Sequence, residues 1–356
     1  MPNHRRLPVV SRPTVAFAAL LLAGTLLSAE PAPTPDALSQ ADLQAAFKVL
    51  RTQFIGAGSL DYDTINRSAL DGLLERLGQG AELVPAKAAK AEEPDSVPKF
   101  HAEMLRDKLA YLRLAEYSAA EMAKVETELN RFRDAKADFL ILDLRVPQAK
   151  ADLEATARFL DRFVAPDTML YRVVRPSEKT PQLYISKQAA QRWKSPIILL
   201  LDSETCGAGE LIAATIQRNY PAFSIGEATL GRTVEYQQIP LNEVVALHFA
   251  SAEILLPDDQ SLFRKGIKPT YLVPQPIDLK HRVFDATSYE PLRKHVFEQS
   301  RPRLNEAALV HATDPELDYH LARARGETTP YDVVPLLDKV VQRAVDLVIT
   351  LQRTAK

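Results

Sequence analysis

One short stretch of this chain carries the residues that could do chemistry. Residues 202–210 are Asp-Ser-Glu-Thr-Cys-Gly-Ala-Gly-Glu, and they lie between an apolar run, Ile197 to Leu201, and a segment with helical spacing, Leu211 to Arg218. A turn from a buried strand into a helix exposes one residue at the helix N-terminus, where backbone N–H groups and the helix dipole favour negative charge. Serine hydrolases place their nucleophile in such a turn. Here Gly207 and Gly209 occupy it, so the position is typical of an active site and the side chains are not.

Composition excludes several classes of function. The chain has 356 residues, of which 46% are hydrophobic and 25% charged, as is typical of a globular protein long enough for two structural units. Its formal net charge is −2 and it has no basic block, which argues against nucleic acid as a partner. The single cysteine, Cys206, excludes an intrachain disulfide. Because no cluster of His, Cys and carboxylates has metal-ligand spacing, we expect neither a metal nor another cofactor.

The N-terminus has the residue order of a secretory signal. Arg5, Arg6 and Arg12 precede an apolar run from Val15 to Leu27, and small residues follow. This order predicts a signal peptide over residues 1–29 and an exported, periplasmic or envelope-associated protein. The apolar run is shorter than an ordinary membrane span. The alternative is an uncleaved N-terminal anchor, which is the only membrane contact that we expect.

The rest of the chain divides into four segments by its periodicity. Apolar residues at helical spacing predict two helices that pack as a hairpin over residues 36–80, and the Ala-, Lys-, Glu- and Pro-rich residues 81–99 predict a linker. Residues 105–280 alternate between strand and helix patterns, and the nearly continuous apolar strand Phe139 to Leu144 indicates a sheet covered on both faces. Residues 281–356 predict a mostly helical extension. We therefore expect an α/β core with helical segments before and after it.

Four blocks of the core resemble the tail-specific, or C-terminal-processing, serine protease family. The first block is Leu140 to Arg145, and the second is the Gly207-Ala208-Gly209-Glu210 turn, where the family carries Ser-Ala-Ser-Glu. The third, Gly226 to Arg232, is similar to the family's Gly-Glu-x-Thr-x-Gly-Lys. The fourth comprises residues 256–261 and 265–269, which are similar to the family's Thr-Pro-Asp-Gly-x-x-Ile and Lys-Gly-Ile-x-Pro-Asp. Their order and spacing agree from about residue 105 to residue 273. The resemblance implies a Clp protease/crotonase-like α/β fold, between an N-terminal helical hairpin and a helical C-terminal tail.

The resemblance also implies what this chain lacks. Many members of that family carry a PDZ domain between hairpin and core, and this domain captures the C-terminus of a substrate. Only the linker-like residues 81–99 separate the two segments here. They are too few for such a domain, so we expect none.

The catalytic positions of that family fall on residues that cannot perform its chemistry. In the family a serine attacks the substrate and a neutral lysine takes its proton. These positions fall on Gly207 and Arg232, with the family's separation of 25 residues. Glycine has no attacking group, and arginine stays protonated at any ordinary pH. The family's glutamine one turn beyond the lysine falls on Tyr236, and its Gly-Gly pair near the oxyanion site falls on Ala149 and Lys150.

Three functions remain open, and whether the chain is an enzyme remains open with them. The joint loss at Gly207 and Arg232 predicts a pseudoprotease that binds polypeptide segments or C-termini. Arg232 and Lys150 would hold a carboxylate there, and Gly207 and Gly209 would allow its close approach. The alternatives are an active peptidase of unorthodox chemistry, with Cys206 as nucleophile or a partner-completed site, and a structural assembly module. The sequence identifies neither the ligand nor the oligomeric state. We expect Ser203 and Thr205 to hydrogen-bond the turn or cap the helix, and Glu210 and Glu227 to form hydrogen bonds at the helix N-terminus or in loops.

Overall fold

The computed structural model describes residues 38–86, 99–106, 108–147, 152–187, 192–297, 313–327, 329 and 335–354. The predicted signal peptide, residues 1–29, lies outside this part of the chain. No helix within these ranges combines the length and the apolar character that crossing a membrane requires. The chain divides into two compact units, residues 1–71 and 72–356.

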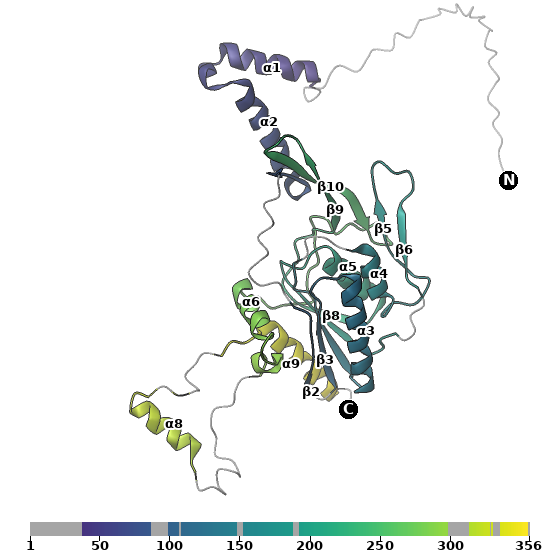
Figure 1. Cartoon of the computed structure of the whole chain (residues 1–356), viewed down its shortest axis with the longest axis vertical. Helices are drawn as coiled ribbons and strands as arrows, with labels where there is room; N and C mark the ends of the chain where they lie inside the picture. Colours follow the sequence, from purple (N-terminus) through teal and green to yellow (C-terminus); the bar gives the residue numbers. More distant parts are fainter. Residues whose placement is uncertain are drawn as a thin grey trace, which may run out of the picture. The chain divides into compact units, whose positions relative to one another are not determined.

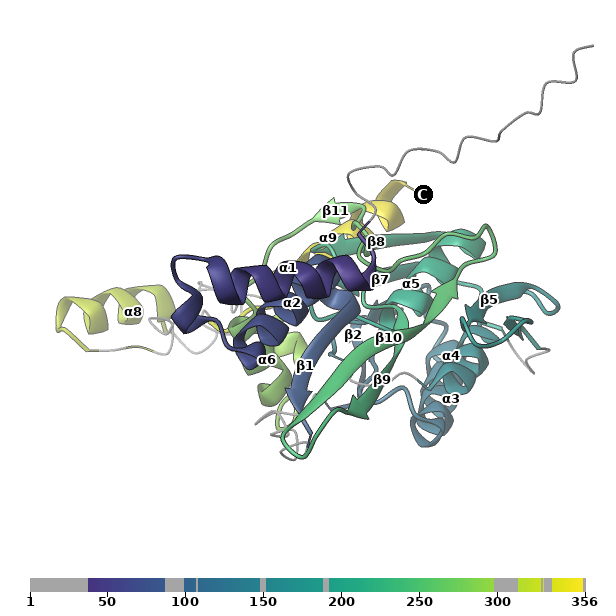
Figure 2. The ribbon, with the colours of Figure 1, turned by 90° about the horizontal axis from the view of Figure 1, so that it is seen from above.

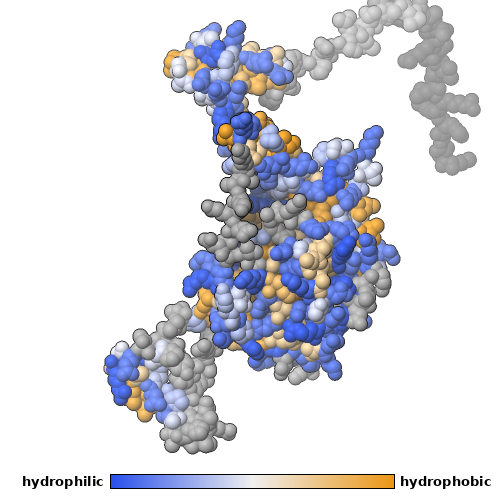
Figure 3. Space-filling view, viewed as in Figure 1, coloured by the Kyte–Doolittle hydropathy of each residue, from blue (hydrophilic) through white to orange (hydrophobic). Residues whose placement is uncertain are grey.

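The N-terminal residues form the two helices that their periodicity predicts. Helix α1 (Gln40–Gln53) begins with a capping box, in which Ser39 and Asp42 satisfy each other's backbone N–H groups, and helix α2 (Tyr62–Leu77) follows a short 3₁₀ turn, η1 (Ala57–Ser59). The guanidinium of Arg51 lies 3.8 Å from the centroid of the Tyr62 ring. Helix α1 buries no side chain, and its exposed apolar residues are drawn in orange on α1 in Figure 3. The two helices are therefore confirmed, but the described residues form no buried core between them.

The linker prediction is wrong at its beginning. Residues Ala81–Pro85 form strand β1, which pairs antiparallel with β10 (Val245–Leu255), so that Ala81 lies opposite Phe249. Figure 2 shows β1, β10 and β9 (Val234–Pro240) side by side. A five-residue edge strand has little periodicity of its own, and its partner lies far away in the sequence. Residues 87–98 of the predicted linker lie outside the described residues.

The core of the second unit is a mainly parallel sheet. Among the described residues, six strands have the order β11-β8-β7-β4-β3-β2. All neighbours are parallel except β2, an antiparallel edge strand. The strand bounds are His101–Arg106 for β2, Leu109–Arg113 for β3, Phe139–Asp143 for β4, Ile197–Leu201 for β7, Ala222–Gly226 for β8 and Tyr271–Leu272 for β11. The buried strands β4 and β7 are the continuous apolar runs of the sequence, which confirms the α/β prediction.

Helices cover both faces of this sheet (Figure 1). Along β3, Ala110 and Leu112 pack against one group of helices, whereas Leu109 and Tyr111 pack against the other, because successive side chains of a strand point to opposite faces. The first group comprises α3 (Ala119–Asp134), α4 (Leu153–Leu160) and α5 (Ala208–Asn219), and the second comprises α6 (Ile277–Ala286), η3 (Leu292–His295) and α9 (Lys339–Thr354). Helix α9 buries five side chains. It is part of the core rather than an extension beyond it, unlike the largely exposed α8 (Pro315–Ala324).

A second sheet lies beside the core. Its order is β1-β10-β5-β6, and β9 also pairs with β10. Strand β5 comprises Met169–Val174 and β6 comprises Gln182–Ile185. The β9–β10 ladder shifts register between Ala250 and Ala252, so that Ser251 forms a β-bulge.

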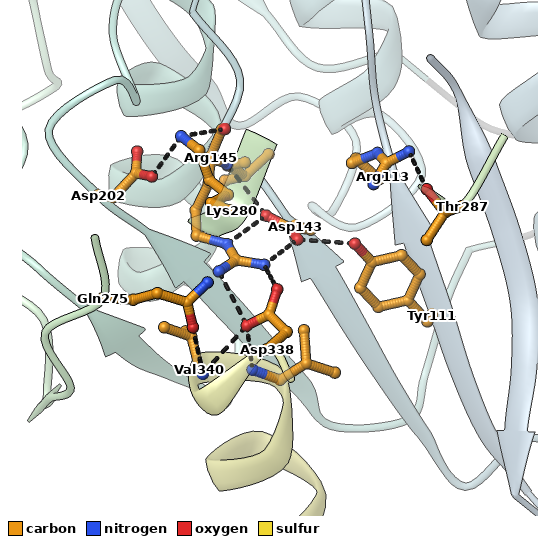
Figure 4. Close-up of polar contacts among 12 residues, drawn as sticks. Tyr111, Arg113, Asp143, Arg145, Asp202, Gln275, Lys280, Thr287, Asp338 and Val340 are labelled. Carbon is orange, nitrogen blue, oxygen red and sulfur yellow. Dashed lines mark hydrogen bonds and ion pairs between the residues drawn. The ribbon is translucent and has the colours of Figure 1, made fainter. Parts of the chain in front are cut away.

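Buried charges join the C-terminal helix to the core sheet (Figure 4). The guanidinium of Arg145 is 1% exposed, and its Nη2 lies 2.6 Å from Oδ2 of Asp143 and 2.8 Å from Oδ2 of Asp338. Burial alone would lower the pKa of Arg145, but the two carboxylates raise it well above its ordinary value. Asp338 also accepts the N–H groups of Val340 and Val341, 3.0–3.1 Å away, at the start of α9. One aspartate therefore neutralises a buried cation and caps a core helix.

Asp338→Ala should lower the free energy of unfolding by about 2–4 kcal/mol, because it leaves N–H groups of the buried Arg145 guanidinium without an acceptor and removes the cap of α9, although Asp143 still pairs with the cation. Urea unfolding followed by circular dichroism measures the change. Asp346→Ala, on the exposed face of α9, is the matched control and should change the free energy by less than about 0.5 kcal/mol. Equal effects of the two substitutions would contradict the role that we give to Asp338.

Candidate functional site

The turn predicted to carry the chemistry is present at the end of β7. Gly207 is the N-cap residue of α5, with φ 52° and ψ −113°, and no side chain caps the helix. Residues with a Cβ atom rarely adopt such a backbone conformation, whereas glycine adopts it without steric cost. The strand-to-helix turn thus has the sharp geometry that presents a residue at a helix N-terminus, but Gly207 presents only backbone there.

Buried side chains form hydrogen bonds with the residues that begin this turn. Lys280 of α6 is 1% exposed, and its Nζ donates to Oδ2 of Asp202 at 2.6 Å, to the carboxylate of Glu204 and to the carbonyl of Arg145 at 3.0 Å. Thr205 accepts the N–H of Asp202 and donates to the carbonyl of Leu144. The hydrogen-bonding role predicted for Thr205 is confirmed. These hydrogen bonds therefore fix the backbone at the start of the turn.

Glu210 joins the first turn of α5 to the loop that carries Arg232. Its fully buried carboxylate accepts the N–H groups of Gly231 at 2.7 Å and Arg232 at 2.9 Å, and the hydroxyls of Thr229 and Thr233. A carboxylate in the first turn also lies where the helix dipole favours negative charge. The structural role predicted for Glu210 is confirmed. The backbone of the two predicted dyad positions is thereby joined through one side chain.

Arg232 is exposed, and its guanidinium forms no hydrogen bond or ion pair with the described residues. The pKa of the Tyr236 phenol depends on the charged groups near Arg232. Burial raises the pKa of Tyr236, the positive charge of Arg232 opposes that shift, and the negative charges of Glu82, Cys206 and Glu210 add to it. Arg232, Glu82, Cys206 and Glu210 are therefore close enough to Tyr236 for their charges to act on its phenol.

Residues from the end of the predicted hairpin and the start of the predicted linker contact Tyr236 and His248 at this site. The hydroxyl of Tyr236 donates to the carbonyl of Gln79 at 3.0 Å, and its ring stacks on His248, with 4.7 Å between ring centroids. Nδ1 of His248 lies 3.1 Å from Oε1 of Glu82 on β1. Our sequence reasoning missed Gln79, Glu82 and His248 as site residues. The only available signal was the short alternation in residues 81–85, and the composition of the following residues obscured it.

The other predicted positions have mixed outcomes. Ala149 and Lys150 lie outside the described residues, so the predicted contribution of Lys150 stays a prediction. Cys206 is half-buried and immediately precedes the turn residue. Gly209 is buried, and a Cβ there would lie 3.1 Å from Cγ2 of Thr205 and 3.3 Å from the hydroxyl of Tyr117. That hydroxyl is buried without a hydrogen-bond partner among the described residues, which sequence reasoning did not anticipate.

The donor set of this region does not suggest a metal centre. Within the described ranges, no group of three or more His, Cys, Asp or Glu side chains is arranged to hold a metal ion. The chemistry that this arrangement offers is instead electrostatic. A helix N-terminus and an exposed guanidinium, on a backbone fixed by Glu210, favour an anion.

Comparison with known proteins identifies the core. Residues 108–273 match the model of peptidase family S41. This segment is a peptidase family S41 domain. The match confirms the resemblance to the C-terminal-processing proteases and, with the observed topology, the tail-specific-protease fold predicted for the core.

The S41 domain has curated relatives in bacteria and chloroplasts. The carboxyl-terminal-processing protease of Synechocystis is 26% identical over 169 residues, which are 48% of this chain and 39% of the relative. The Bartonella bacilliformis carboxy-terminal-processing protease is 27% identical over 248 residues, or 65% and 55%. The Arabidopsis thaliana chloroplastic carboxyl-terminal-processing peptidase 1 is 24% identical over 166 residues, or 46% and 33%. The chain thus spans between a third and just over half of the length of these relatives.

Solved structures similar to the S41 domain include the photosystem II D1 C-terminal processing protease and a lipoprotein from Streptococcus agalactiae. The first has a TM-score of 0.41 and 17% identity, and the match covers 58% of this chain and 52% of that chain. The second has a TM-score of 0.44 and 12% identity, with 70% and 90% covered. The absence of a catalytic dyad from this S41 domain rests on the aligned motifs alone and stays a prediction.

Acid should weaken the support of the turn. Burial alone would raise the pKa of Glu204, but its hydrogen bonds with Lys280 and His281 outweigh burial and lower it below the ordinary 4.5. The unfolded chain therefore takes up this proton first as the pH falls. The stability that Glu204 contributes is present above about pH 4.5 and is lost as the pH falls through its folded-state pKa.

Glu204→Gln should thus lower the free energy of unfolding at pH 7 and make it fall less steeply below pH 4.5. Urea unfolding at a series of pH values measures both effects. Glu243→Gln, at an exposed carboxylate with no described partner, should preserve the wild-type slope. An unchanged slope in Glu204→Gln would show that this carboxylate does not titrate differently in the folded state.

Proposed function

We propose that this chain is a non-hydrolysing S41 homologue that binds polypeptides by their free C-terminal carboxylate. The exposed guanidinium of Arg232, without a described partner and beside the N-terminus of α5, is the observation that carries the proposal. Export to the periplasm or envelope is part of the same proposal and rests on the signal-like residues 1–29. Lys150 is a second candidate for contact with the carboxylate.

The chemistry of the two dyad positions supports binding without hydrolysis. Gly207 offers no oxygen or sulfur for attack, and the guanidinium of Arg232 cannot accept the proton that a nucleophile must lose. The surrounding frame nevertheless remains, because Glu210 still holds the loop of Arg232 against α5. A carboxylate at this position would meet a fixed cation and the positive end of a helix.

An open strand edge leads to Arg232. Strand β9 begins at Val234, two residues after Arg232, and among the described strands it pairs only with β10. An extended peptide can add to such an edge through backbone hydrogen bonds, which are independent of its sequence. A peptide running along β9 toward its beginning would bring its terminal carboxylate to Arg232. Strand addition therefore supplies affinity, and the guanidinium selects the chain end.

Binding should depend on both charges. A fluorescein-labelled peptide with a free C-terminus should bind the full chain more tightly than its C-terminal amide, and Arg232→Ala should weaken the acid peptide by about fivefold, as expected for one exposed charge pair. Fluorescence anisotropy measures both affinities. Lys265→Ala removes an exposed cation from a neighbouring loop and should preserve the difference between acid and amide. Equal binding of acid and amide would refute the proposal.

A second function has one specific observation in its favour. His248, paired with Glu82, stacks on Tyr236, and Cys206 also lies near that tyrosine. A thiol, an imidazole and a carboxylate are the groups of a cysteine-type nucleophilic site. This arrangement supports an active peptidase with Cys206 as nucleophile, in place of the missing serine.

Peptidase assays on an unstructured reporter separate the two functions. We expect no turnover by the native chain or by Cys206→Ala, because neither has a nucleophile–base pair. We expect turnover only in Gly207→Ser combined with Arg232→Lys, which restores both groups to a backbone already shaped for them. Native turnover that Cys206→Ala abolishes would instead establish the cysteine site.

A further inference from the structure

A cavity of about 330 Å³ lies on the second sheet, next to the Arg232 loop. Its walls come from β5, β9, β10 and Phe263, and the N–H of Val234 in its lining donates to the carbonyl of Arg232 at 3.0 Å. The size is within the range of small-molecule and side-chain pockets. Val234 therefore links the lining of the cavity to the loop that carries Arg232.

Cross-strand pairing determines what the cavity contains. Glu253 of β10 lies opposite Val174 of β5 on one side and opposite Val234 of β9 on the other. Directly paired residues of neighbouring strands share a face of the sheet. The Glu253 carboxylate thus stands between two valines, and Phe263 and Pro176 contribute further apolar lining.

The β-bulge in β10 explains why a cavity remains beside Glu253. The register shift falls between Ala250 and Ala252, and both residues line the cavity with the bulged Ser251. Their side chains are too small to fill the surface between β9 and the loop of Phe263. A bulge flanked by small residues therefore leaves a hollow beside a strand that would otherwise be covered.

The charge in this hollow is not neutralised. Glu253 is exposed, is the only charged residue in the lining, and forms no ion pair or hydrogen bond with the described residues. Glu235, which lies opposite Ala252 on the adjacent strand, is instead paired with Arg175, with 2.8 Å between its Oε2 and Nη2 of the arginine. An apolar hollow with a single free carboxylate is complementary to an aliphatic chain that ends in a cation. Lysine and arginine side chains have this form, since their methylene stems pack on apolar surface while the charged end pairs.

We propose that this cavity binds a lysine or arginine side chain of the polypeptide whose C-terminus contacts Arg232. This inference rests on the proposed function. The stem lies between Val174 and Val234, the cation contacts Glu253, and Phe263 contributes to the apolar lining around the stem. Arg232 and Glu253 together select a ligand that has a terminal anion and an upstream cation. The proposal thus names a class of ligand, chain ends that carry a basic residue shortly before the last one.

Peptide pairs test this selectivity. In short peptides with free C-termini, a lysine is moved through successive upstream positions, and norleucine, which has the same stem without the charge, replaces it in each partner peptide. The full chain should prefer lysine by about fivefold at one or two adjacent positions, the value of one exposed ion pair. Glu253→Gln should abolish that preference. Glu243→Gln, the same change at an exposed position in the turn between β9 and β10, should retain it.

A small probe tests the cavity without the carboxylate site. Nα-acetyl-lysine N-methylamide should show saturation transfer from the protein in NMR experiments, and Glu253→Gln should reduce the signal to that of the norleucine analogue. Thermal unfolding of each variant confirms that it is folded.

The outcomes separate the two proposals. Arg232-dependent binding of acid peptides, with no lysine preference and no effect of Glu253 on the small probe, would overturn the cavity and leave the proposed function standing. Glu253-dependent binding of the small probe, with peptides indifferent to Arg232, would support the cation site and overturn the C-terminal site. If neither ligand binds, both proposals are wrong.

Discussion

The buried guanidinium of Arg145 is the constraint on which the arrangement of the second unit depends. A cation that is 1% exposed needs opposite charge close by, because the interior cannot replace its hydration. Asp143 satisfies part of this need from the adjacent strand β4, and Asp338 satisfies the rest from the start of α9. Helix α9 can therefore close the second face of the sheet in one register only, with its cap against Arg145. The carbonyl of the same arginine accepts from Lys280, so the network extends to the turn below Gly207.

Positioning through buried carboxylates recurs at the site. Glu210 does for the Arg232 loop what Asp338 does for α9, since each accepts backbone N–H groups from a segment remote in sequence. These contacts fix backbone rather than reactive side chains. A frame of this kind survives substitution at the positions that it presents, because its hydrogen bonds do not involve the side chains of Gly207 or Arg232. The structure thus fixes the geometry of this turn and its facing loop independently of the side chains at positions 207 and 232.

The parts of the fold that could be predicted are those with a local signal. Strands β4 and β7 are uninterrupted apolar runs, and the turn at Gly207 follows from a strand, two glycines and a helical pattern. The parts that could not be predicted depend on partners far apart in the chain. Strand β1 is recognisable only through its pairing with β10, and the Arg145–Asp338 pair joins residues 193 positions apart. The same limitation applies to Glu253, whose valine neighbours come from two other strands. The family match does not predict the first two of these pairings, because β1 and Asp338 lie outside the matched residues.

The backbone of Gly207 has a consequence for the balance between stability and activity. A residue with a Cβ held at φ 52° and ψ −113° carries conformational strain, on the order of 1–3 kcal/mol, which an enzyme tolerates in exchange for an exposed nucleophile. Glycine at this position releases that strain. The turn therefore gains folded-state stability at a position where a residue with a side chain would lose it. At position 207 an exposed side chain and a strain-free turn are therefore alternatives, and this chain has the strain-free turn.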